Sequence, residues 1–196
     1  DIINTQEDKS PVLITGSTTL VENGQKVELE INGKKYSGLV TDNRWSITLP
    51  ALDAQALDAT ERVIAIATNL AGDKSEPAAR DIQHSLANPT ITINPVAIDD
   101  HINNSEDDVP VIVSGKTSLV ENNAKVSVVV NGKTYTGLVA DNSWSIAMPA
   151  ADAQALAAQE NINANVTNNA GDKAQTQRPI THSINAPTIS INVIAG

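Results

Sequence analysis

Short runs in which hydrophobic and polar residues alternate follow one another along the whole chain. In residues 27–31, three apolar side chains alternate with two glutamates and then meet Asn32-Gly33. A period of two predicts a strand with one buried face, and Asn-Gly predicts a type I′ turn because both of its central residues need positive φ. Residues 126–132 repeat this pattern. The sequence therefore predicts the same β-hairpin in two parts of the chain.

The repeat extends far beyond the hairpin. Residues 38–47 return as residues 137–146, and Trp45 returns as Trp144, 99 residues later. A period of this length corresponds to a whole small domain, because solenoid units are only about 20 to 50 residues long. We therefore expect two copies of one module, residues 1–98 and residues 99–196, each folding around its own core.

Further strands are predicted on both sides of each Trp. A proline ends the Trp strand, and Asp53 or Asp152 then opens what we expect to be a short, capped helical turn. Each copy has four other expected strands, one before the hairpin and three after the helical turn. In copy one they are residues 11–16, 63–67, 82–85 and 90–93. In copy two they are residues 109–115, 162–166, 180–183 and 188–191. About seven antiparallel strands in a module of this size predict an all-β chain of two tandem immunoglobulin-like β-sandwich domains.

Composition limits how these cores can be stabilised. The chain has no Phe, two Trp and two Tyr, so its cores depend on smaller aliphatic side chains and bury less area than aromatic ones. It has no Cys, which excludes a disulfide. The net charge of −10 argues against nucleic acid and anionic membranes as partners. Ca²⁺ suits this composition, because it takes oxygen ligands from carboxylates, amides and carbonyls.

The chain shows no targeting or membrane-spanning segment. No apolar stretch approaches the roughly 18 residues of a transmembrane helix, and no charged-then-apolar leader opens the sequence. A start at Asp1 indicates a piece of a longer protein, which we expect to be monomeric and not inserted in a membrane. The lack of Cys, the acidity and the repetition are typical of an exported bacterial surface protein.

An acidic segment, residues 99–108, marks the boundary between the copies. Residues 1–8 match it, so it belongs to the repeat. When strand directions are counted from this segment, the loop 168–172 is expected to return beside Asp99, Asp100, Asn103 and Glu106. Such a group of oxygens, with carbonyls and water, would give Ca²⁺ its roughly six to eight ligands. The alternative is a solvated acidic turn in which Asn serves as a cap.

Five motifs occur in the same order in each copy. They are Asp-Asp-x-Ile-Asn-x-x-Glu (whose first Asp is missing from copy one), Asn-Gly-Lys-x-Tyr-x-Gly, Trp-Ser-Ile, Asp-Ala-Gln-Ala-Leu and Asn-x-Ala-Gly-Asp. This series resembles the bacterial immunoglobulin-like (BIg) extender repeats of giant RTX and Bap-type biofilm adhesins.

The resemblance implies an extracellular array on the bacterial cell surface. In such an array Ca²⁺ at each interdomain linker rigidifies the tandem repeats, and a distal adhesive tip is projected from the cell. The partners are then the neighbouring repeats of the same chain. The Ca²⁺ ligands that the resemblance implies are Asp99, Asp100, Asn103, Glu106, Asn168 and Asp172 in copy two, and Asp1, Asn4, Glu7, Asn69 and Asp73 in copy one.

The sequence bears on two other functions, catalysis and direct ligand binding. An enzyme is disfavoured because His84 and His182 are repeat equivalents on an expected strand, His101 has no equivalent, and no nucleophile motif surrounds them. Zinc is disfavoured because the chain lacks Cys and clustered His. A module that binds a glycan or protein directly remains the alternative to a spacer. Such surfaces favour exposed aromatic and Arg residues, whereas Tyr and Trp here fall inside expected strands.

Overall fold

The computed structural model describes residues 1–183, 185 and 187–191. The chain divides into two compact units, Asp1–Asn88 (unit 1) and Pro89–Gly196 (unit 2). Both consist of β-strands, and their α-helices α1 (Ala51–Ala54) and α2 (Ala150–Ala153) are single turns. The expectation of an all-β chain is confirmed. No helix among the described residues is long and apolar enough to cross a membrane.

Unit 1 contains two sheets. The larger has the strand order β1-β7-β6-β3-β4, and the smaller pairs β2 with β5. The elements of unit 1 are β1 (Ile2–Ile3), the 3₁₀ turn η1 (Glu7–Lys9), β2 (Val12–Ser17), β3 (Lys26–Ile31), β4 (Lys34–Leu39), β5 (Arg44–Leu49), β6 (Thr60–Ala67) and β7 (Ala78–His84).

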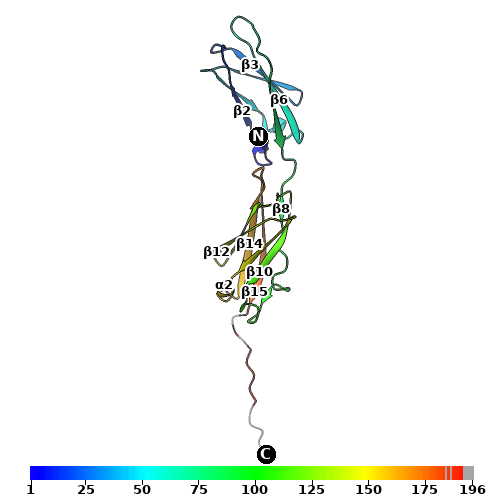
Figure 1. The fold of residues 1–196 in the computed structure, drawn as a ribbon, viewed down its shortest axis with the longest axis vertical. Coiled ribbons are helices and arrows are strands. Elements are labelled where there is room, and N and C mark those ends of the chain that lie inside the picture. Colours follow the sequence, from blue (N-terminus) through cyan, green and yellow to red (C-terminus); the bar gives the residue numbers. More distant parts are fainter. Residues whose placement is uncertain (184, 186, 192–196) are drawn as a thin grey trace, which may run out of the picture. The chain divides into compact units, whose positions relative to one another are not determined.

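Unit 2 repeats this arrangement and adds one strand. Its larger sheet has the order β12-β11-β14-β15-β9, and its smaller sheet has the order β13-β10-β8 (Figure 1). The strands of unit 2 are β8 (Thr90–Ile91), β9 (His101–Ile102), β10 (Val111–Ser118), β11 (Lys125–Val130), β12 (Lys133–Leu138), β13 (Ser143–Met148), β14 (Gln159–Thr167) and β15 (Lys173–His182).

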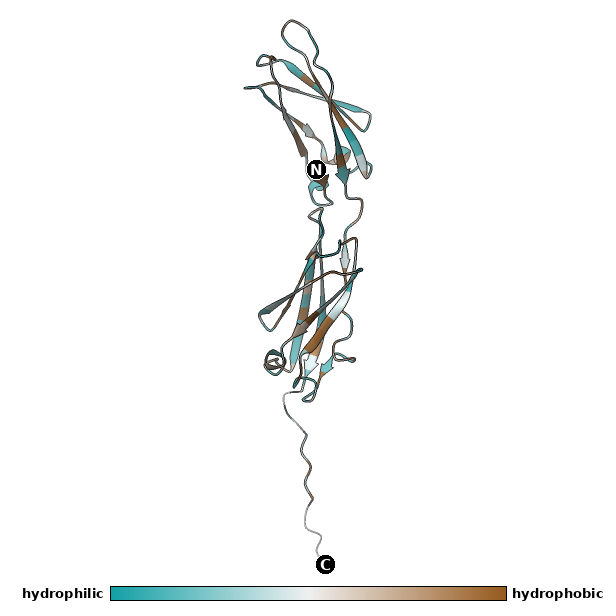
Figure 2. Ribbon diagram, viewed as in Figure 1, coloured by the Kyte–Doolittle hydropathy of each residue, from teal (hydrophilic) through white to brown (hydrophobic). Residues whose placement is uncertain are grey.

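The hydrophobic alternation and the turn residues act as the sequence predicts. Strand β3 alternates exposed and buried residues, and hydrophobic and hydrophilic colours alternate along the strands in Figure 2. Asn32 and Gly33 have φ values of 47° and 67°, and Asn131 and Gly132 have 46° and 69°. These positive values allow the tight hairpins β3–β4 and β11–β12.

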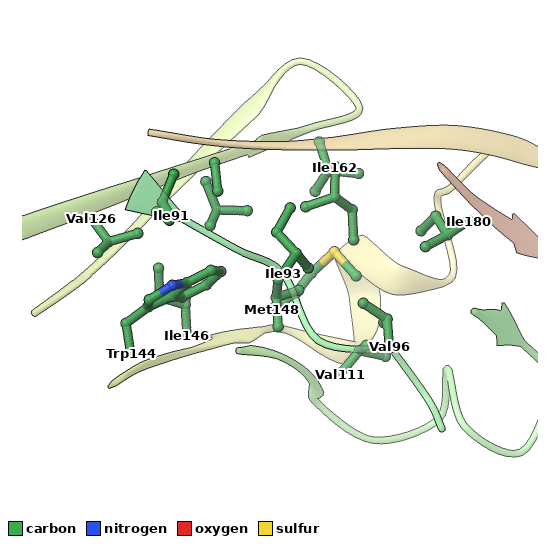
Figure 3. Close-up of a cluster of buried hydrophobic side chains, with 14 of the residues drawn as sticks. Ile91, Ile93, Val96, Val111, Val126, Trp144, Ile146, Met148, Ile162 and Ile180 are labelled. Atoms are coloured by element: carbon green, nitrogen blue, oxygen red, sulfur yellow. The ribbon is translucent and has the colours of Figure 1, made fainter. Parts of the chain in front are cut away.

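The described core of unit 2 includes residues that the sequence assigned to copy one. Trp144 is 3% exposed and lies among aliphatic side chains that include Ile91, Ile93 and Val96 (Figure 3). Strand β8 pairs with β10, so residues 90–93 open unit 2 and do not close copy one. The compact units accordingly divide between Asn88 and Pro89, whereas the sequence suggested residues 98 and 99.

Two smaller expectations are wrong. Asp53 does not cap its helical turn, because the N-cap residue is Pro50 and makes no side-chain cap hydrogen bond. Asp53 instead accepts hydrogen bonds from Lys34 and from the Tyr36 hydroxyl. Residues 188–191, expected as a closing strand, are not in a strand.

Candidate metal centre

Asp100 is held by an ion pair across unit 2. Its Oδ1 accepts a hydrogen bond from Arg178 Nε at 2.6 Å, and its Oδ2 accepts one from Arg178 Nη2 at 2.5 Å. The Val96 amide also donates to Oδ1, at 2.9 Å. Hydrogen bonds from Arg178, together with the Val96 amide and the charge of the guanidinium, hold the pKa of Asp100 below its usual value, although partial burial opposes the shift. This geometry uses both carboxylate oxygens.

Asn103 and Glu106 form a reciprocal turn cap. Asn103 Oδ1 accepts hydrogen bonds from the amides of Ser105 and Glu106, and the Asn103 amide donates to Glu106 Oε2 at 3.0 Å. This exchange satisfies the backbone donors that a turn leaves without a partner. Asn103 and Glu106 therefore cap a polar turn, as the alternative reading of this segment expects.

Asp107 reaches a buried histidine. Its Oδ2 lies 2.8 Å from His182 Nε2, and His182 Nδ1 lies 3.0 Å from the Leu156 carbonyl oxygen. A carbonyl can only accept, so Nδ1 carries hydrogen. Because an ionised carboxylate also only accepts, the second contact needs a further proton, on either Nε2 or Asp107. The pair connects the acidic segment to the end of β15.

Unit 1 builds the same contacts from the equivalent residues. Asp1 pairs with Arg80, and Asp8 Oδ2 lies 3.1 Å from His84 Nε2. Asn4 Oδ1 accepts hydrogen bonds from the amides of Gln6 and Glu7, while the Asn4 amide donates to Glu7 Oε2. The acidic segment therefore has one architecture in both units.

The loop 168–172 is a separate polar turn. Asn168 Oδ1 accepts the Asp172 amide at 2.9 Å, and the Asn168 amide donates to the Asp172 carbonyl at 3.0 Å. Asp172 is fully buried, whereas its equivalent Asp73 is exposed. Asn69 and Asp73 exchange the matching backbone and side-chain bonds in unit 1.

The structure does not bring the acidic segment and this loop together within a unit. Ile102 pairs with His182 at the last residue of β15, whereas the loop immediately precedes Lys173, its first residue. The nine residues of strand from Lys173 to Thr181 span roughly 26 to 30 Å. The expected proximity of Asn168 and Asp172 to the acidic segment is wrong for unit 2. Asn69 and Asp73 are likewise far from Asn4 and Glu7 in unit 1, because Ile2 pairs with Gln83 near the end of β7.

The error has a topological cause. The count of strand directions treats the acidic segment as the start of the module, but β8 precedes it and runs antiparallel to β10. The chain then crosses to the larger sheet, where β9 lies parallel to β15. The acidic segment consequently lies at the end opposite to the loop.

The expected donors fit Ca²⁺ only in part. Asp100 and Asp1 already face an Arg, and the described part of the chain contains no group of three or more His, Asp or Glu side chains that could hold a metal ion. Asp99 uses Oδ1 to accept the His101 amide, and Glu106 uses Oε2, so each has a second carboxylate oxygen for a cation.

Sequence reasoning missed the partners of the acidic segment. Arg178 and Arg80 occupy equivalent places in the repeat, as do Asp107 and Asp8. The sequence signal that could have indicated these partners is that both copies keep the Arg and the Asp at equivalent positions. Their pairing could not be read from the sequence because it depends on β9 lying beside β15.

Known structures are similar to this chain. No family model matches it, and no curated relative does. An adhesin described as Ca²⁺-stabilised, which helps an Antarctic bacterium reach out and bind ice, shows 28% identity over 93% of this chain with a TM-score of 0.54. A 1.5-MDa bacterial ice-binding adhesin, described in connection with host cell surface retention, shows 26% identity over 93% with a TM-score of 0.52.

A third similar structure is a bacterial immunoglobulin-like domain from the M. primoryensis ice-binding adhesin. It shows 29% identity over 49% of this chain, with a TM-score of 0.37, and 94% of that domain is covered. The chain spans 46% and 60% of the lengths of the first two structures. The resemblance to adhesin repeats that the motifs indicate is confirmed.

Proposed function

Because the chain resembles the extender repeats of large bacterial adhesins, we propose that it is a spacer segment of a bacterial surface adhesin. Its two units are then tandem immunoglobulin-like sandwiches whose task is to separate an adhesive tip from the cell. The parent protein is extracellular, and the chain itself carries no catalytic role. Neighbouring repeats of the same protein are its partners.

The observation that carries this proposal is the duplicated acidic segment. Each unit fastens this segment to its last long strand through an Asp–Arg pair and an Asp–His pair. A spacer needs repeats that reproduce the same ends. A ligand-binding site requires no such duplication, and neither Trp is exposed on a loop, since Trp45 and Trp144 lie in β5 and β13.

We further propose that Ca²⁺ binds the exposed oxygens of the acidic segment and stiffens the linkers between repeats. The donors in unit 2 are the second oxygens of Asp99 and Glu106, with backbone carbonyls and water completing the coordination. Clustered carboxylates repel one another, and a divalent cation removes that repulsion. Extracellular Ca²⁺ sites function with Kd values of about 10⁻⁴ to 10⁻³ M. This proposal draws support from the neighbour described as Ca²⁺-stabilised.

Small-angle scattering and calorimetry with Ca²⁺ or with EDTA test the proposal on the whole chain. We expect saturable Ca²⁺ binding, together with a narrower distribution of dimensions in Ca²⁺ than in EDTA. The double variant Asp99→Ala with Glu106→Gln should lose that response. Glu30→Gln with Glu76→Gln removes the same charge from unit 1 and should keep it. Identical scattering in both solutions would contradict the stiffening role, and saturable binding on a glycan array would favour the ligand-binding alternative.

A further inference from the structure

In unit 2, the hairpin β11–β12 is fastened to the helical turn α2 and the residues after it. The Tyr135 hydroxyl donates to Asp152 Oδ2 at 2.8 Å, and Lys133 pairs with Oδ1 of the same carboxylate. Asn131, in the hairpin turn, donates through Nδ2 to the Ala155 carbonyl at 2.9 Å. Three side chains of the hairpin therefore hold one short segment, and we call this group of contacts the clasp.

Unit 1 contains the same clasp between the hairpin β3–β4 and α1. The Tyr36 hydroxyl donates to Asp53 Oδ2 at 2.8 Å, and Lys34 pairs with the other oxygen of Asp53. Asn32 Nδ2 donates to the Ala56 carbonyl at 2.8 Å. These contacts join the motif Asn-Gly-Lys-x-Tyr-x-Gly to the motif Asp-Ala-Gln-Ala-Leu. The spacer function leaves both of these repeated motifs without a role.

The charged members of the clasp lie at the surface. The side chains of Lys34 and Lys133 are 55% and 53% exposed, and those of Asp53 and Asp152 are 21% exposed. Ion pairs as exposed as these add little to the stability of a whole fold. Their presence in both units therefore directs attention to the hairpin that they hold.

Each hairpin ends in a strand at the edge of its sheet. The strand order of the larger sheet ends at β4 in unit 1 and at β12 in unit 2. In a hairpin with a two-residue turn, alternate residues bond to the partner strand, beginning with the pair next to the turn, here Val130 and Lys133. The backbone groups of Thr134, Thr136 and Leu138 consequently point away from β11. A row of such groups is a template for pairing with another chain.

The far end of β12 lies against β13. A Cβ on Gly137 would lie 3.2 Å from the Ser145 carbonyl oxygen and 2.6 Å from Ile146 Cγ1, so glycine allows the two strands to approach there. Gly38 is the equivalent residue and approaches β5 in the same way. No described strand lies beyond residues 133–136 in the sheet order, and this is the part of β12 that the clasp fastens.

We propose that the clasp is an autoinhibitory contact that stops β12 from pairing with β12 of a second copy. Held by α2 at one end and by β13 at the other, the strand follows the twist of its own sandwich. Once it is released from α2, two β12 strands pair antiparallel about a two-fold axis through the backbone groups of Thr134 and Thr136. The strand has no Pro, and Lys133 is its one charged residue, so little else opposes this pairing.

Hydrogen exchange on the whole chain tests whether the clasp holds the hairpin. Asp152→Ala removes the acceptor of both Tyr135 and Lys133. The amides of these two residues, which bond to β11, should then exchange about tenfold faster, because a hydrogen bond to a charged acceptor is lost. Tyr135→Phe keeps the ring and should act in the same direction, whereas Asp141→Asn removes an equal charge beyond the other end of β12 and should leave the rates unchanged. Equal exchange in Asp152→Ala and the unchanged chain would overturn the proposal.

Sedimentation of the same variants over a range of concentrations tests the second copy. Asp152→Ala should associate increasingly with concentration, whereas the unchanged chain and Asp141→Asn should remain monomeric. Adding Thr136→Pro to Asp152→Ala removes an outward-pointing amide, leaves the pairing with β11 intact and should restore the monomer. A loosened hairpin that stays monomeric would overturn the proposal. Association that survives Thr136→Pro would do so too, because an unfolded chain aggregates with or without that amide. Neither readout depends on Ca²⁺ or on the spacer function.

Discussion

His182 and Asp107 form a buried contact that joins the two ends of unit 2. Their side chains are 2% and 9% exposed, and Nε2 lies 2.8 Å from Oδ2. His182 is the last residue of β15, while Asp107 lies in the segment that leads into β10. His84 and Asp8 repeat the contact at 3.1 Å in unit 1. The contact closes each unit at the end where the acidic segment lies.

Replacing His182 by Ala should therefore destabilise unit 2. The change leaves Asp107 buried without its hydrogen-bond partner, and a buried polar group left unsatisfied costs about 1 to 3 kcal/mol. Denaturant unfolding should show the loss in unit 2, and the double variant with Asp107→Asn should be less destabilised than the two single losses added together. Strictly additive losses would mean that the two side chains do not interact.

Asp100→Asn should remove a pH-dependent part of the stability of unit 2. The folded pKa of Asp100 lies below its ordinary value of 3.8, mainly because Arg178 donates to the carboxylate. Its contribution is therefore fully present above that ordinary value and is lost as the pH falls through the lowered folded pKa. Thermal unfolding between about pH 2 and pH 6 should show a smaller decrease for Asp100→Asn than for the unchanged chain. Asp99→Asn, which alters an exposed neighbour, should leave the decrease intact.

The tyrosines should ionise at unusually high pH. Burial, followed by the hydrogen bond to Asp53 or Asp152, raises the pKa of Tyr36 and of Tyr135 to about 12. The chain has only two Tyr, so its tyrosinate absorbance reports on these residues alone. Their stabilising contribution is present below the ordinary value of 10.0 and is lost as the pH rises towards 12. Absorbance that rises around pH 10 in the folded chain would contradict this, and Asp152→Asn should bring one Tyr closer to its ordinary titration.

Gly115→Ala should destabilise unit 2 more than Gly16→Ala destabilises unit 1. The added methyl would lie 1.8 Å from the Thr92 carbonyl oxygen in unit 2, which is backbone, whereas in unit 1 it would lie 2.4 Å from the half-buried Trp45 ring, which is a side chain that can move aside. Overpacking of this kind costs about 1 to 3 kcal/mol. Unfolding of the two variants, measured by near-UV circular dichroism, should separate them by at least about 1 kcal/mol. Equal losses would show that β10 does not need the glycine for the approach of residues 92–94.

Ca²⁺ should stabilise the chain by mass action if it binds the folded units. For a site with a Kd of about 10⁻⁴ to 10⁻³ M, about 10 mM Ca²⁺ adds roughly 1.4 to 2.7 kcal/mol. Calorimetry should show the melting temperature rise with Ca²⁺ and return with EDTA. If Ca²⁺ does not raise the melting temperature of the unchanged chain, this site is excluded. It is also excluded if Ca²⁺ raises the melting temperature of the Asp99 and Glu106 double variant by the same amount.

The hairpins, the strands that carry Trp45 and Trp144, and the duplication could be predicted from the sequence because each depends on local pattern. Asn32-Gly33 specifies its turn through φ alone, and the alternation in residues 27–31 specifies which side chains are buried. These signals act within a few residues and need no knowledge of the neighbouring strand.

The position of the acidic segment could not be predicted in the same way. It depends on whether residues 90–93 pair with the strands before them or after them, and both are compatible with an alternating apolar run. The buried position of Ile91 and Ile93 beside Trp144 decides the matter in the structure. The partners of Asp100 and Asp107 follow from that choice, since β9 then lies beside β15.

The parallel pairing of β9 with β15 determines how unit 2 responds to tension. A pull applied through β8 and a pull applied beyond His182 act on these two strands in opposite directions along their length. The force is therefore a shear, and it is resisted together by two backbone hydrogen bonds, from the Thr181 amide to the Asp100 carbonyl and from the Ser183 amide to the Ile102 carbonyl. Because Arg178 holds Asp100 across the same pair of strands, the unit should yield only when these contacts rupture at once.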